Sequence, residues 1–260
     1  EHRFYLFEKS LDITPGVAAN YFSDFGTHSF PGVDLGWQIN TKLRLYANTG
    51  ATFRIPTFTD LYYSDRTTLG NVYLKPEEAT SNEIGIRFSN PKVTASVALF
   101  SRKAKNLIDF VKNSDDDTTP FKAENIQQVN TSGIDLELIH FIQVNNLTHQ
   151  FKISYFYLEN TLENSGYNFS RYSINNDLKH HFVGNYFLPV RKNFSGNLVF
   201  KYVERTSGDA YSVVDLSVQR TLSQFQVSLY FNNIFNTEYW ESNLVPMPKG
   251  NGLLGLRYSF

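Results

Sequence analysis

Apolar and polar residues alternate one by one along most of the chain, which is the pattern of β-strands with two different faces. The C-terminus shows this clearly, because Leu254, Leu256, Tyr258 and Phe260 alternate with glycine, arginine and serine. Soluble domains usually fray at such an end, so the pattern indicates a strand that is paired along its whole length. It predicts about thirteen antiparallel strands, near residues 2–10, 16–23, 33–39, 42–49, 80–89, 92–112, 121–144, 147–160, 173–188, 193–204, 211–221, 224–232 and 250–260.

The connections between these strands alternate between tight turns and long loops. Asn40–Thr41, Asn90–Pro91, Asn145–Asn146 and Leu222–Ser223 are predicted tight turns. The predicted long loops are 24–32, 50–79, 113–120, 161–174, 205–210 and 233–249. This asymmetry is typical of outer-membrane β-barrels, which have short periplasmic turns and long extracellular loops. Bacterial barrels have an even number of strands, so an odd count predicts that further strands precede this chain.

Two architectures share this periodicity, a membrane barrel and a soluble β-sandwich. The polar face of the strands is rich in charged and amide side chains, and aromatic residues gather at strand ends. Several strands are longer than the five or six residues usual in sandwiches. These features favour the membrane barrel. The predicted lumen-facing residues are Arg44, Asn48, Glu83, Arg87, Asp135, Glu137, Lys152, Asn197, Lys201, Asp215, Gln219 and Arg257.

Composition narrows the function classes. The formal net charge of −1 argues against nucleic acid as a partner. The absence of cysteine excludes disulfides and thiolate metal sites. No run approaches the roughly 20 apolar residues that a transmembrane helix needs. Neither a GxSxG nucleophile motif nor a phosphate-binding loop is present, so we expect no enzyme and no cofactor.

Four stretches resemble, in order, segments of TonB-dependent outer-membrane receptors. "GATFRIPTFTDLYY" (50–63) is similar to their GxxFRxPxxxELY segment, and "LKPEEATSNEIGIRF" (74–88) to the LxPExxxxxExG segment that follows it. "LYFNNIFNTEYWESNLVPMP" (229–248) resembles their penultimate strand and the loop after it, and "GLLGLRYSF" (252–260) their last strand. One departure is "KGNG" at 249–252, where the family often has Gly-Arg.

The resemblance implies a 22-stranded barrel with a plugged lumen, of which residues 1–260 would be the C-terminal part, without the N-terminal plug and first strands. It implies energy-coupled uptake of a scarce solute, such as a ferric siderophore, haem, cobalamin or a glycan. It also implies location in the outer membrane of a Gram-negative bacterium. Leu254, Leu256, Tyr258 and Phe260 would be the signal for the barrel-assembly machinery. The other implied partners are outer-membrane lipid, TonB through the missing plug, and a small-molecule or metal-chelate ligand.

Two other functions stay open at this point, a passive porin or structural barrel and a soluble carbohydrate-binding sandwich. A porin would have an open lumen and no plug. A soluble sandwich would need no detergent.

Long loops usually have a function, and two of them carry candidate ligand contacts. Tyr62, Tyr63, Asp65 and Arg66 lie in the predicted loop 50–79, and Tyr239 and Trp240 lie in the predicted loop 233–249. The aromatic members of both groups are equally consistent with anchors at the membrane interface.

The acidic run Asp115, Asp116 and Asp117 is a weak candidate for binding a hard cation through carboxylate oxygens. Its spacing is not that of an EF-hand, so a solvated acidic loop is favoured. His180 and His181 are adjacent and therefore point to opposite faces of a strand. We expect no metal or haem site.

Overall fold

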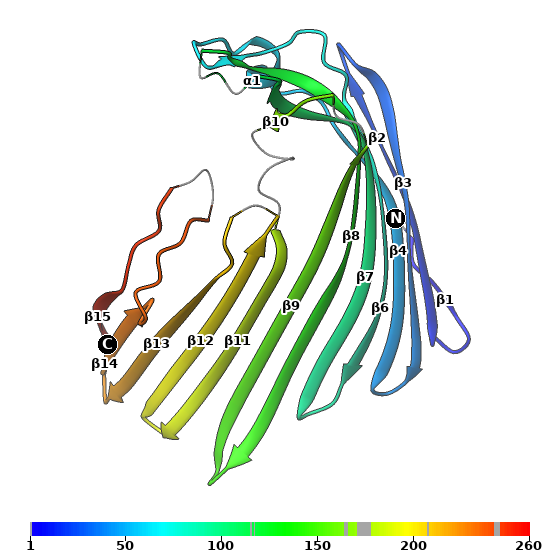
Figure 1. The fold of residues 1–260 in the computed structure, drawn as a ribbon. Coiled ribbons are helices and arrows are strands. Elements are labelled where there is room, and N and C mark those ends of the chain that lie inside the picture. The colour runs from blue at the N-terminus through cyan, green and yellow to red at the C-terminus, as the bar shows by residue number, and fades with distance from the viewer. Residues whose placement is uncertain are drawn as a thin grey trace. The chain divides into compact units, whose positions relative to one another are not determined.

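The computed structural model describes residues 2–114, 116, 118–163, 166–170, 178–206, 208–241 and 245–260 (Figure 1). Nearly all regular structure in it is β-strand. Among the described residues no helix is long and apolar enough to cross a membrane. The elements are β1 (Phe4–Leu6), β2 (Leu11–Phe22), β3 (Gly26–Asn40), β4 (Leu43–Arg54), α1 (Phe58–Tyr62), β5 (Thr68–Leu69), β6 (Glu77–Ser89), β7 (Val93–Lys112), β8 (Phe121–Val144), β9 (Leu147–Glu163), β10 (Phe169–Ser170), β11 (Leu178–Arg191), β12 (Phe194–Arg205), β13 (Tyr211–Leu222), β14 (Phe225–Asn232) and β15 (Asn251–Tyr258).

The strands form one sheet in which the neighbours follow chain order, β1-β2-β3-β4-β6-β7-β8-β9-β11-β12-β13-β14-β15. This path holds thirteen strands, so the predicted count is confirmed. The short strands β5 and β10 lie off the path and pair with β8 and β7. They and the short helix were missed, because elements of two to five residues leave no periodicity to detect.

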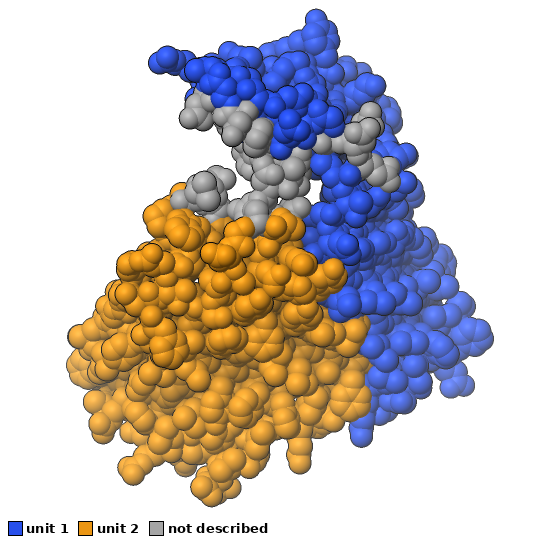
Figure 2. Space-filling model, in the orientation of Figure 1, with its two compact units in different colours: residues 1–86, 98–134, 158–177 blue, residues 87–97, 135–157, 178–260 orange. Residues whose placement is uncertain are grey.

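The chain divides into two compact units, coloured separately in Figure 2. Unit 1 comprises residues 1–86, 98–134 and 158–177, and contains the ladders from β1 to β4. Unit 2 comprises residues 87–97, 135–157 and 178–260, and contains the ladders from β11 to β15. The two groups of predicted ligand contacts therefore belong to different units.

The bounds predicted for the first three strands were wrong. The stretch 24–32 is not a loop, because β3 begins at Gly26 and pairs with β2 up to Phe22. Pro15 and Pro31 lie inside strands β2 and β3. Both prolines are paired in the β2–β3 ladder, but on the other side each lies beyond the last paired residues. The β1–β2 ladder reaches only Ile13, and the β3–β4 ladder ends at Gly32. A proline there removes no ladder hydrogen bond.

Small residues on one face make room for large ones on the next strand. The ring of Tyr46 covers Gly85, and a Cβ on that glycine would lie 2.4 Å from Tyr46 Cζ. Gly36 likewise lies under the guanidinium of Arg44, which bonds Asp12 at 2.7 Å. The Arg44–Asp12 pair shows which face of the sheet is polar. The ring of Tyr46 leaves no room for a side chain at position 85, which explains the glycine of the ExG segment.

The opposite face carries large apolar side chains that are exposed. On β7, Val97 and Leu99 are 41% and 51% exposed, whereas the intervening Ala98 is buried. The same face of β6 exposes Ile84 and Ile86. Contiguous exposed apolar rows of this kind are rare on soluble monomers and mark contact with lipid or with another protein.

A small hydrophobic core lies in unit 1 at the long-loop end of the sheet. Leu74, Ile108, Phe110 and Ala123 are buried together, and Leu61 of α1 and Phe121 pack against them. The residues of this core come from two strands, β7 and β8, and from the connection 55–76, so the core attaches that connection to the sheet.

Candidate functional site

The connection between β4 and β6, residues 55–76 (hereafter loop 55–76), is attached to the sheet by an ion network. Arg54 at the end of β4 donates to Asp60 Oδ2 at 3.1 Å and to Glu77 Oε1 at 2.6 Å. Glu77 Oε1 also accepts the backbone N–H of Ile108 at 2.8 Å. Both carboxylates are buried, and charge-assisted bonds of this kind are about twice as strong as neutral ones. The network therefore ties β4, α1, β6 and β7 together at one point.

The helix α1 begins with a capping box. Asp60 N donates to Thr57 Oγ1 at 3.2 Å, and Thr57 N donates to Asp60 Oδ2 at 2.9 Å. This satisfies two of the backbone donors that a helix start leaves unpaired. Asp60 thus serves both the cap and the ion network, so the helix cannot move without breaking the network.

The far half of loop 55–76 is equally well attached. β5 pairs in parallel with the start of β8, Thr68 opposite Phe121. Gly70 passes so close to α1 that a Cβ would lie 2.8 Å from the carbonyl of Leu61. Asn125 of β8 holds Lys75 from both sides, accepting its N–H at 2.8 Å and donating to its C=O at 2.9 Å. These contacts hold loop 55–76 in a defined conformation, although it contains little regular secondary structure.

Two of the predicted contact residues stabilise the turn between α1 and β5. Asp65 accepts hydrogen bonds from the backbone and hydroxyl of Thr67, at 2.7 and 2.9 Å, and from the Tyr63 hydroxyl at 2.8 Å. These donors, the Thr67 N–H first, lower the pKa of Asp65 to about 2. The carboxylate of Asp65 is therefore engaged within the loop.

The shift gives a pH prediction for this turn. Its stabilisation by Asp65 is fully present above the ordinary pKa of 3.8 and is lost as the pH falls through about 2. Hydrogen exchange at the Thr67 amide is expected to stay slow at pH 4 and to accelerate near pH 2. The variant Asp65→Ala, which removes the acceptor of the Thr67 N–H, should exchange quickly at every pH. A transition at pH 4 in the parent protein would contradict the assignment.

Aromatic side chains on loop 55–76 remain open to solvent. Tyr62 is 62% exposed and Phe58 is 83% exposed, with their ring centroids 5.6 Å apart. Tyr73 on the same loop is 87% exposed, and Arg66 is exposed as well. Exposed rings on a rigid loop offer contact area at little entropic cost. Phe58 and Tyr73 were not among the predicted contacts.

In unit 2, the connection 233–250 (hereafter loop 233–250) starts from one buried asparagine. Asn233 is 2% exposed and has a φ of 50°. Its side chain accepts the N–H of Thr237 at 2.9 Å and donates to the C=O groups of Thr237 and Pro248 at 2.8 and 3.5 Å. Its backbone N–H donates to Asp215 Oδ1 at 2.7 Å. Asn233 therefore attaches both ends of the loop to β13.

Tyr239 takes part in a second cluster of unit 2. Its ring lies 4.6 Å from that of Tyr211, and the Lys201 ammonium lies 5.9 and 6.0 Å from the two ring centroids. Lys201 also pairs with Glu241, and this hydrogen bond lowers the pKa of the Glu241 carboxyl. Tyr239 is thus half-buried, whereas the neighbouring Trp240 is 50% exposed.

The acidic run at 115–117 lies mostly outside the described residues, since only Asp116 is described. Asp116 accepts the hydroxyl and the N–H of Thr118 at 2.7 and 2.9 Å, which lowers its pKa. The described part of the chain contains no group of three histidine, aspartate or glutamate residues able to hold a metal ion.

Comparison with known proteins decides the family. The family model "TonB dependent receptor-like, beta-barrel" matches residues 1–234. The chain belongs to this family. It is 26% identical over 233 residues to the vitamin B12 transporter BtuB of Vibrio vulnificus, covering 84% of this chain and 34% of that one. The chain thus spans about a third of the length of this curated relative.

Two solved receptors share the fold of this TonB-dependent receptor barrel. The siderophore receptor PirA from Acinetobacter baumannii matches with a TM-score of 0.78 at 15% identity, over 99% of this chain and 44% of that one. The ferric enterobactin receptor PfeA from Pseudomonas aeruginosa, solved in complex with enterobactin, matches with a TM-score of 0.77 at 14% identity, over 99% and 44%. These three relatives are named as a transporter and as receptors.

The receptor-barrel motifs gain a physical meaning from the network. Arg54 belongs to the FRxP segment, Asp60 to the segment read as ELY, and Glu77 to the LxPE segment. The motifs alone assigned no structural role to Arg54, Asp60 or Glu77. The spacing Thr57-x-x-Asp60 is that of a capping box. It is a sequence signal for the start of α1 that was overlooked.

Proposed function

We propose that this chain forms part of the wall of an outer-membrane receptor that takes up a metal-chelate solute with energy supplied through TonB. The observation that carries the proposal is the pair of contrasting sheet faces. One face holds ion pairs such as Arg44–Asp12, and the other exposes rows of apolar side chains such as Val97 and Leu99. A barrel wall between lipid and a polar lumen needs this contrast.

The loops would provide the capturing surface. Loop 55–76 is rigidly attached, yet it presents Phe58, Tyr62 and Tyr73 to solvent. Trp240 has the same character in unit 2. The relatives are named as carriers of vitamin B12 and as siderophore receptors, and both classes of solute are compact metal chelates. Aromatic rings contact such ligands well because they bury a large area with few rotatable bonds.

The two other candidate functions receive less support. A soluble sandwich packs two sheets face to face, whereas these strands follow one another in a single chain-ordered sheet. A passive porin needs no ordered loop to capture a solute, and the family model that matches this chain is one of receptors.

Ligand binding by the full-length receptor tests the proposal. With cobalamin and ferric enterobactin as probes, we expect one of them to bind, and Tyr62→Ala with Tyr73→Ala to weaken that binding about tenfold or more. Phe7→Ala is the matched control, because Phe7 is 76% exposed but lies in the tight turn between β1 and β2. Equal losses in both variants, or a receptor that stays monodisperse without detergent, would contradict the proposal.

A further inference from the structure

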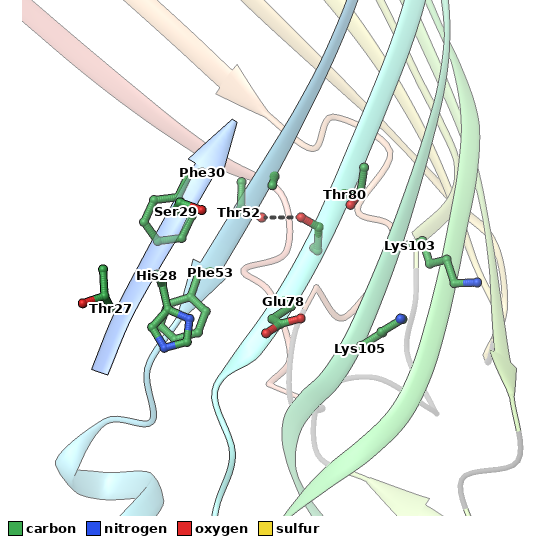
Figure 3. A pocket seen from close by; sticks show the side chains of 12 residues that line it. Thr27, His28, Ser29, Phe30, Thr52, Phe53, Glu78, Thr80, Lys103 and Lys105 are labelled. Atoms are coloured by element: carbon green, nitrogen blue, oxygen red, sulfur yellow. Dashed lines mark hydrogen bonds between the residues drawn. The ribbon is translucent and has the colours of Figure 1, made fainter. Parts of the chain in front are cut away.

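A hollow of about 560 Å³ lies on unit 1 where β3, β4, β6 and β7 approach the long-loop end. Figure 3 shows the stacked rings of His28 and Phe53, then Glu78, then Lys105 and Lys103. The two rings are 3.8 Å apart, and His28 Nε2 is held 2.8 Å from the carbonyl of Phe25. The hollow therefore has an ordered aromatic side and a charged side.

The charged side continues the apolar face of the sheet. On β7, Lys103 and Lys105 follow Val97 and Leu99 at every second residue, whereas Ala104 between the lysines is 1% exposed and faces the other way. On β6, Glu78 and Thr80 stand in the same relation to the exposed Ile84 and Ile86. The hollow thus lies where each apolar row ends and polar residues begin.

Lys103 and Lys105 lack an ion-pair partner among the residues that the structure describes, although both line the hollow with Glu78. Cations without a partner at the border of a lipid-facing surface attract anionic lipid headgroups, each worth about 1 kcal/mol near such a surface. Aromatic residues are enriched at the same level of the membrane.

We infer that this hollow binds the phosphate group of an anionic lipid of the outer leaflet. Lys103 and Lys105 supply the charge, the His28–Phe53 pair packs against the body of the headgroup, and Glu78 weakens the site. The inference rests on the proposed placement in the outer membrane, and it concerns the outside of the wall and not the capture of solute.

Native mass spectrometry of the full-length receptor in mild detergent tests the site, with diphosphoryl lipid A as the probe. Lys103→Gln with Lys105→Gln is expected to lower the affinity about 25-fold, because two lysines near an anionic lipid contribute about a factor of five each. Glu78→Gln is expected to raise it. Lys42→Gln with Lys92→Gln, at the tight-turn end, is the matched control and should change nothing.

The following results would overturn the inference. Unchanged affinity in the pocket variant, or equal binding of dephosphorylated lipid A, excludes recognition of the phosphate. If inorganic phosphate displaces the lipid at equal concentration, the ligand is free phosphate and not a headgroup. Failure of the membrane placement is seen separately, as a receptor that needs no detergent.

Discussion

Replacing Arg54 with methionine is expected to release loop 55–76 from the sheet. The variant keeps most of the side-chain volume but leaves the buried carboxylates of Asp60 and Glu77 without their cation. Breaking a buried ion pair from one side costs about 3–5 kcal/mol, and we expect the low end, about 3 kcal/mol, because the arginine is partly exposed. Hydrogen exchange at the Ile108 and Leu61 amides should then accelerate about a hundredfold, since each factor of ten is about 1.4 kcal/mol.

Two further variants separate this network from a general effect of losing a positive charge. Arg66→Met removes an exposed arginine from the same loop and should leave both amides protected. Adding Asp60→Asn and Glu77→Gln to Arg54→Met should restore part of the protection, because the amides keep the acceptors for Thr57 and Ile108 without a buried charge. Equal acceleration in Arg54→Met and Arg66→Met would show that the network does not hold the loop.

The order of the loop has a consequence for ligand capture. A flexible loop loses conformational entropy when it binds, whereas a loop already fixed by its own contacts does not pay that cost again. Arg54→Met is therefore expected to weaken ligand binding although Arg54 lies beneath the loop and contacts no proposed ligand. The effect would act through the position of Tyr62 and Phe58, which stand on the helix that Asp60 caps.

Much of the fold was predictable, because strand alternation is a local property with a period of two. The bounds of β8 were predicted as observed, since its alternation continues between a clear loop and a clear turn. The bounds of the first strands were wrong, and most of the stretch predicted as the loop 24–32 belongs to β3. Whether Pro15 and Pro31 interrupt a strand depends on how far the neighbouring strands reach, and the local sequence does not contain that information.

The candidate site was predictable only in part, because its contacts join residues that are distant along the chain. Tyr62 and Tyr239 were found by their loops, and their contact with a ligand stays a prediction. The structure shows that Tyr63 and Asp65 bind each other and that Tyr239 packs on Tyr211, so these side chains have structural roles in any case. The network of Arg54 with Glu77 joins residues 23 positions apart. Such a contact follows from the register of β4 and β6 and not from the spacing along the chain.

Replacing Asn233 with alanine is expected to detach loop 233–250. The change removes the side-chain partners of the Thr237 N–H and C=O, and each buried group left unsatisfied costs about 1–3 kcal/mol. It also places an alanine at a φ of 50°, which costs about 1 kcal/mol more than asparagine or glycine there. We expect a total of about 3 kcal/mol, measured as faster exchange at the Thr237 and Met247 amides.

The glycine variant divides this total into its two causes. Asn233→Gly keeps the backbone conformation and loses only the hydrogen bonds, so it should be about 1 kcal/mol less destabilising than Asn233→Ala. Asn236 also has a positive φ but is exposed, and its side-chain Oδ1 accepts a hydrogen bond from Gly250 N at 2.9 Å. Asn236→Ala should therefore have a smaller effect. If it loosens the loop as much as Asn233→Ala does, strain at positive φ dominates, and the buried amide of Asn233 is not what attaches loop 233–250 to β13.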